Sequence, residues 1–143
     1  MQEKIVNIAQ RLKEQYGTND PIELCRCLGI TFVRADLPEK LGGFYMESGG
    51  KQAVCVSNAL EAPFDKAVAA HEVGHALLHR GLNLIFMCES TNFIPGRYER
   101  EADFFSAALL IDRDKAKDNG NIADVSRQHG IPLYAVERLL TEV

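Results

Sequence analysis

The most constraining feature of this sequence is a largely apolar segment that carries three histidines at intervals of four residues. A long helix is expected there, beginning at Pro63, reaching His79-Arg80 and ending at Gly81. Most of its other residues are alanine, valine and leucine, so the helix should be apolar nearly all round and therefore buried. Gly74 interrupts it at a cost of roughly 1 kcal/mol relative to alanine, which indicates the close approach of another element.

The histidines of this helix gather on one side. At about 100° per residue, His71, His75 and His79 fall within an arc of about 80°, and Glu72 lies at its edge. His71 and His75 are roughly 6 Å apart at the backbone and can reach the same ion. Glu72 can instead reach a water molecule that the ion holds. A lone histidine on an apolar helix is usually a packed core residue, but these four groups would each need a buried partner, which favours a metal site.

A catalytic zinc ion needs a third protein ligand and an open position for water, and a second helix from about Arg97 to Leu110 offers candidates. Glu99 and Asp103 lie about 40° apart on one face of it, whereas Glu101 points roughly 160–200° away. We predict that Glu99 is the third ligand, because Asp103 beside it can accept the outer N–H of a ligating histidine. Glu101 remains the less favoured alternative.

The remaining site candidates are aromatic. His79 could contact a metal ligand, face the substrate or simply pack, and its position in the sequence leaves these alternatives open. Tyr98 or His79 could also donate a hydrogen bond to the developing oxyanion of a peptide substrate.

Periodicity along the rest of the chain predicts short elements around these two helices. Helices are expected at 3–16, 20–28, 122–129 and 132–142, and strands at 30–33, 42–46 and 52–56, the last two forming a hairpin. The fold class is therefore α+β, with dominant helices and a small, three-stranded, mostly antiparallel sheet. We expect residues 1–143 to form one domain, with residues 121–143 as a helical pair packed on it.

Composition and charge exclude several classes of function. A net charge of −4 gives no sign of the basic stripe that a nucleic-acid-binding protein carries. Residues 1–4 lead into an amphipathic helix, and no apolar run approaches a membrane span. We therefore expect a cytoplasmic protein that contacts neither nucleic acid nor membrane directly. Its four cysteines should be reduced and mostly packed in the core, although Cys88 lies in a loop, 82–95, that is expected to border the cleft.

The motif HEVGHALLH at 71–79, followed by YEREADFFSAALL at 98–110, resembles the ImmA/IrrE family of gluzincin-like metallopeptidases. Segments 20–24, 28–30 and 41–45 are similar to the opening of that family and to its first hairpin strand. The resemblance covers most of residues 3–143 and is strongest at 64–111. It implies a zincin-like fold and a Zn²⁺ ion bound by His71, His75 and Glu99, with Glu72 as general base. It also implies a protein substrate, a helix-turn-helix repressor of a mobile element or stress operon.

In the resulting mechanism, Glu72 takes a proton from the attacking water and delivers it to the leaving amine of the peptide. Residues 55–57, at the end of the second hairpin strand, are expected to present a sheet edge to which an extended substrate adds as a strand. A non-catalytic protein that binds zinc and sequesters a repressor is the alternative. The presence of Glu72 argues against it, because a purely structural site has no evident need of that carboxylate.

The C-terminal helical pair raises a further alternative, because residues 122–139 have the rhythm of a helix-turn-helix motif with a turn at 130–132. A DNA reader needs cations on its second helix and flanks. Residues 121–143 instead have two cations against three anions, a balance of −1: Arg127 and Arg138 against Asp124, Glu137 and Glu142. We therefore expect this pair to pack on the domain or to dock the substrate protein, and not to bind DNA.

Overall fold

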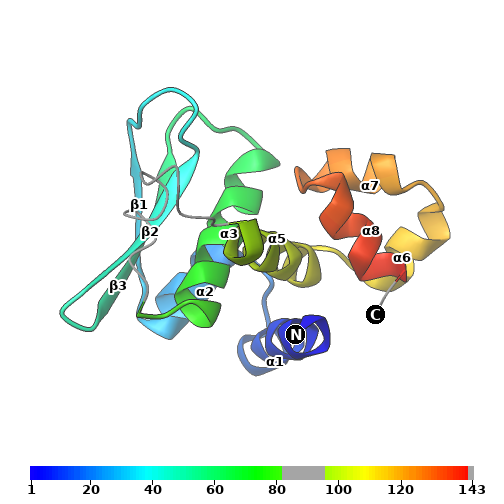
Figure 1. Cartoon of the computed structure of the whole chain (residues 1–143), viewed down its shortest axis with the longest axis horizontal. Coiled ribbons are helices and arrows are strands. Elements are labelled where there is room, and N and C mark those ends of the chain that lie inside the picture. Colours follow the sequence, from blue (N-terminus) through cyan, green and yellow to red (C-terminus); the bar gives the residue numbers. More distant parts are fainter. Residues whose placement is uncertain (82–95, 142–143) are drawn as a thin grey trace.

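The computed structural model describes residues 1–81 and 96–141 (Figure 1). The fold is α+β with dominant helices, as predicted. Its elements, in chain order, are α1 (Gln2–Tyr16), α2 (Pro21–Leu28), β1 (Thr31–Ala35), β2 (Gly43–Ser48), β3 (Lys51–Ser57), α3 (Phe64–Leu78), α5 (Gly96–Leu110), α6 (Arg113–Asn119), α7 (Ile122–His129) and α8 (Leu133–Thr141). In Figure 1 the sheet lies at one end, α3 and α5 cross in the centre, and α6 to α8 lie at the other end.

The three strands form a mixed sheet in the order β1-β3-β2. β1 runs parallel to β3, with Thr31 opposite Ala53, and β2 runs antiparallel to it, with Gly43 opposite Val56. The predicted hairpin is present. However, β3 lies in the middle with both sides paired, so the prediction that residues 55–57 form an open edge is wrong. The hairpin pattern could not reveal that a parallel third strand covers that side.

Helices α3 and α5 cross closely at a glycine. A Cβ atom on Gly74 would lie 3.1 Å from ring carbon Cδ1 of Phe105 and 3.3 Å from Cα of Ala102. Even an alanine at position 74 would require these neighbours to shift by a few tenths of an ångström, so the close approach predicted from this glycine is confirmed. Val73 and Phe105 are fully buried at the same crossing.

The helix ends follow local chemistry. Asp20 caps α2 by accepting a 2.9 Å hydrogen bond from the backbone N–H of Ile22, and Pro21 occupies the first helical position. α6 was not predicted, because its sequence has little apolar periodicity and only Ala116 is buried. Its boundaries have ordinary signals, with Asp112 as the N-terminal cap and Gly120 in the left-handed region at its end.

The C-terminal pair α7 and α8 packs against the centre of the molecule. A Cβ atom on Gly130, in the turn between them, would lie 3.0 Å from ring carbon Cδ1 of Phe64 at the start of α3. Val136 and Leu139 of α8 are fully buried. In the part of the chain that is described, no helix is long and apolar enough to cross a membrane.

Three of the cysteines can be placed. Cys25 and Cys55 are buried, as expected for packed thiols, whereas Cys27 is exposed. Cys88 and the loop 82–95, expected to border the cleft, lie outside the described residues.

Candidate metal centre

Three side chains from two helices converge on one point. His71 and His75 lie one turn apart on α3, and the first turn of α5 brings Glu99 opposite them. Nε2 of His71 is 2.9 Å from Oε2 of Glu99, and Nε2 of His75 is 2.9 Å from Oε1 of the same carboxylate. The two Nε2 atoms are 3.1 Å apart. The two imidazoles and the carboxylate thus form a compact triangle of ligand-type atoms.

The spacing of this triangle fits a divalent ion of the size of zinc. Zn–N and Zn–O bonds of about 2.0–2.2 Å place the ligand atoms of a tetrahedral site roughly 3.3 Å apart. The separations of 2.9–3.1 Å differ from that value by only a few tenths of an ångström. Small side-chain rotations would open the triangle enough to hold the ion, and the neutral imidazole and carboxylate donors suit zinc chemistry.

Glu72 is buried beside this triangle. Burial raises the pKa of its carboxyl to about 7. The charge of His71 acts to lower this pKa, whereas the negative charges of Glu99 and Asp103 act to raise it. A buried carboxyl that titrates near neutrality, next to potential metal ligands, is a candidate for proton transfer.

Glu72 also lines a cavity of about 280 Å³ that spans four parts of the fold. The start of β2 at Gly42-Gly43 forms one wall, and the turn between α7 and α8, with Gly130 and Pro132, forms another. The remaining lining residues come from α3 and α5: Ala67, Val68, His71, Asp103 and Ser106. The cavity therefore connects the edge strand β2 to the cluster of ionisable groups.

Asp103 supports His71 from behind. Its Oδ1 is 2.7 Å from Nδ1 of His71, and its Oδ2 accepts a hydrogen bond from the phenol of Tyr134 on α8. Burial alone would lower the pKa of His71, but hydrogen bonds to Asp103 and Glu99, with the charge of Glu72, raise it to about 10. Tyr134 was not recognised from the sequence, because only the folding of α8 onto α5 brings it to the site.

Glu99 responds to the same neighbours in the opposite direction. Burial alone would raise the pKa of this carboxyl, but hydrogen bonds to His71 and His75 outweigh it and hold the pKa well below its usual range. Glu99 is therefore a carboxylate at neutral pH, the form that binds a cation.

His75 has a different environment. Burial lowers the pKa of its imidazole despite the hydrogen bond to Glu99, so it is neutral at ordinary pH. Its Nδ1 lies 2.9 Å from Nδ1 of His79, whose Nε2 lies 2.7 Å from Oε1 of Glu101. His79 is thus a buried neighbour of His75. The ring of Tyr98 packs edge-on against His79, with centroids 4.8 Å apart.

Glu101 lies away from the triangle, at the far side of His79. Angular positions around α5 alone do not predict its contact with His79, because that contact depends on how α5 packs against α3. His79 caps the end of α3 and reaches a different stripe of α5.

The family of the chain follows from its match to known proteins. Residues 25–137 match the model of a peptidase family described as the IrrE N-terminal-like domain. The chain belongs to this family. The matched span contains the whole of α3 and α5, and it confirms the family resemblance stated from the HEVGHALLH and YEREADFFSAALL segments.

Two relatives of this IrrE-like protein are informative. An uncharacterized immunity region protein 2 of Bacillus phage phi105 is 31% identical over 127 residues, which cover 86% of this chain and 80% of the relative. Metallopeptidase ImmA of Bacillus subtilis (strain 168) is 26% identical over 102 residues, covering 71% of this chain and 60% of ImmA. Family and relatives support a metallopeptidase-type function, which implies a metal ion.

Proposed function

We propose that this protein is a zinc-dependent endopeptidase in which His71, His75 and Glu99 bind the ion and Glu72 is the general base. The observation that carries this proposal is the triangle of two Nε2 atoms and one carboxylate, 2.9–3.1 Å on a side, next to the buried Glu72. When bound, zinc would lower the pKa of a water molecule to about 7 and polarise the scissile carbonyl.

Glu72 moves the proton in this mechanism. It accepts a proton from the attacking water and delivers it to the leaving amine, a step that typically contributes about 10²–10⁴-fold. Burial, which raises its pKa to about 7, suits this double role, because a group that titrates near the working pH both gains and loses a proton readily.

Asp103 and His79 orient the two ligating imidazoles. A carboxylate only accepts hydrogen bonds, so the 2.7 Å contact with Asp103 keeps the proton of His71 on Nδ1 and leaves Nε2 free for the ion. His79 occupies the corresponding position at Nδ1 of His75. Tyr98 packs on His79, which supports a role in holding that ring.

The substrate segment lies along β2. This strand is paired only with β3 among the described residues, and Gly43 at its start lines the cavity that contains Glu72. An extended peptide that adds to the free side of β2 would pass directly over Glu72. A cavity of about 280 Å³ admits side chains and not a folded domain, so the scissile bond lies in an extended segment of the substrate.

The substrate we favour is a helix-turn-helix repressor in the cytoplasm. The motif resemblance implies such a partner, and the name of the phage relative refers to an immunity region. Gly130 and Pro132 form one wall of the cavity, which supports a role for the C-terminal pair in substrate docking.

The test is proteolysis by the zinc-loaded protein of candidate repressors and of an unbiased peptide mixture. Glu72→Gln should lower the cleavage rate at least about 10²-fold while the zinc content stays unchanged. Glu61→Gln, an exposed glutamate just before α3, is the matched control and should cleave normally. Unchanged cleavage by Glu72→Gln would remove Glu72 from the mechanism. Zinc binding and repressor binding without any cleavage would favour a non-catalytic regulator.

A further inference from the structure

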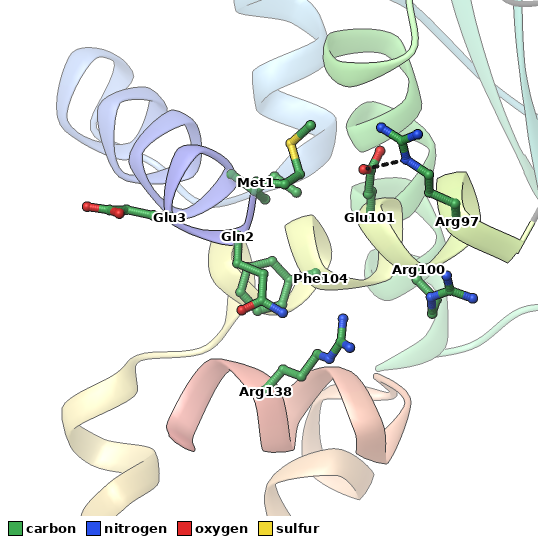
Figure 2. Close-up of a pocket in the computed structure, with 9 residues that line it drawn as sticks. Met1, Gln2, Glu3, Arg97, Arg100, Glu101, Phe104 and Arg138 are labelled. Atoms are coloured by element: carbon green, nitrogen blue, oxygen red, sulfur yellow. Dashed lines mark hydrogen bonds and ion pairs between the residues drawn. The ribbon is translucent and has the colours of Figure 1, made fainter. Parts of the chain in front are cut away.

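Among the described residues, Glu101 is the one carboxylate near the metal centre that the proposed mechanism does not use. It is largely buried, with 14% of its side chain exposed, and its Oε1 lies 2.7 Å from Nε2 of His79. On its other side, its Oε2 pairs with Arg97 at 3.5 Å, one turn earlier on α5. Figure 2 shows this ion pair at the wall of a cavity of about 640 Å³ between the start of α1, α5 and α8.

Two sets of residues on α5 contact α3 at different points along its length. Glu99 and Asp103, four residues apart, face His71 and His75. Tyr98 and Glu101, three residues apart, both contact His79 at the end of α3. One helix therefore supplies a carboxylate to the ion-binding triangle and two more carboxylates to the histidines around it.

Once His75 binds an ion, the two hydrogen bonds that link His75 to His79 and His79 to Glu101 can be donated in only one direction. A ligating Nε2 carries no proton, so the proton of His75 must lie on Nδ1 and be donated to Nδ1 of His79, 2.9 Å away. The proton of His79 must then lie on Nε2, where it is donated to Glu101. Only an acceptor at the end of the chain completes this order, and a carboxylate is the strongest one.

Burial makes this order consequential. The side chains of His75 and His79 are only 2% and 3% exposed, so water has little access to either ring. A proton on the wrong nitrogen of either ring would leave one N–H without an acceptor or bring two N–H groups face to face. Both arrangements destabilise a site from which water is excluded.

From these contacts we propose that Glu101 is a positioning residue that acts through His79. It holds the ring of His75 in the orientation and in the tautomer, with the proton on Nδ1, that bind the metal. Each ligating imidazole is then backed by one carboxylate, His71 directly by Asp103 and His75 through an intervening imidazole by Glu101. This inference rests on the proposed zinc site and gives a role to a residue outside it.

The test measures zinc affinity by competition with a chromophoric chelator. Glu101→Gln keeps the size of the side chain and removes its charge, and it should raise the zinc dissociation constant about 10-fold or more. Glu101→Asp, which keeps the carboxylate, should lose less. The matched control is Glu47→Gln, which removes another part-buried glutamate that pairs with an arginine, Arg80. It should stay within about twofold of the unchanged protein.

A double-mutant cycle separates positioning from general damage. If Glu101 acts through His79, Glu101→Gln should add nothing further in a His79→Gln background. In the zinc-loaded protein, the ring ¹⁵N spectrum should show protons on Nδ1 of His75 and Nε2 of His79, and Glu101→Gln should disturb the second. Circular dichroism checks that each variant is folded.

Three outcomes would overturn the inference. An unchanged zinc affinity in folded Glu101→Gln, or fully additive losses in the cycle, would refute it while leaving the proposed function intact. A protein that binds no zinc before any substitution would remove the proposed function and this inference together.

Discussion

His71 and His75 are the same residue type one helical turn apart, yet their surroundings differ in nearly every respect. His71 is 16% exposed, lines the cavity that also contains Glu72 and meets the carboxylate of Asp103 directly. His75 is 2% exposed and meets another imidazole, that of His79, which in turn contacts the carboxylate of Glu101. Accordingly, the pKa of His71 is raised and that of His75 is lowered. The imidazole of His71 therefore keeps its second proton at neutral pH, whereas that of His75 does not.

The largest effect is expected on the His71 side. Asp103→Asn retains the shape of the side chain but removes the charge that holds the proton of His71 on Nδ1, so zinc affinity should fall about 10–100-fold. Chelator competition measures this loss. Asp112→Asn, at the cap of α6, is a suitable control, because it removes the charge of an aspartate that does not line the cavity of the candidate metal centre, and it should leave zinc affinity unchanged. Equal zinc affinity in Asp103→Asn would mean that the Asp103 contact does not position His71.

The dependence of zinc affinity on pH sharpens the comparison. Zinc must displace one proton from His71, whose pKa is about 10, and none from the neutral His75. Between about pH 8 and 9, above the titration of Glu72, the affinity should therefore rise about tenfold per pH unit, and not a hundredfold. Competition titrations across this range measure the slope. A slope of two protons would show that both imidazoles titrate together, contrary to the asymmetry.

The stability of the metal-free protein should change in the opposite direction. Folding raises the pKa of His71 from 6.5 to about 10, so protonated His71 stabilises the fold fully below about pH 6.5. That contribution is lost as the pH rises through about 10. Thermal unfolding of the metal-free protein should show a decline across this window, and a smaller decline in Asp103→Asn.

The smallest effect is expected at Tyr134, which acts on His71 only through Asp103. Tyr134→Phe removes one hydrogen bond to Asp103, and zinc affinity should fall by roughly 2- to 10-fold. We expect the lower end of this range, because Tyr134 is 39% exposed and water can replace its hydroxyl. A loss as large as that of Asp103→Asn would show that α8 holds Asp103 in place, and that the C-terminal pair is needed for the site itself.

The sequence was informative where chemistry repeats at helical spacing. The interval between His71 and His75, and that between Glu99 and Asp103, predicted which side chains would share a face, and the structure brings these four residues together. Gly74 predicted the close helix crossing that makes this possible. Such features depend on local geometry, which is fixed by 3.6 residues per turn.

Features that depend on distant packing were not predictable. Nothing near residues 55–57 showed that β1 would cover the side of β3 opposite the hairpin. Tyr134 reaches Asp103 only because α8 folds back on α5, and Glu101 reaches His79 because α5 packs against the end of α3. In each case the partner is set by tertiary structure, for which a single sequence has no periodic signal.

The identity of the atoms that bind the ion is the most direct test of the proposed zinc site. X-ray absorption at the zinc edge, on protein loaded with one equivalent of zinc, would identify these atoms. The predicted spectrum has two imidazole nitrogens and one or more oxygens at about 2.0–2.2 Å, and the carboxylate contribution should disappear in Glu99→Ala. A sulfur ligand at about 2.3 Å, or a spectrum unchanged in Glu99→Ala, would contradict the account.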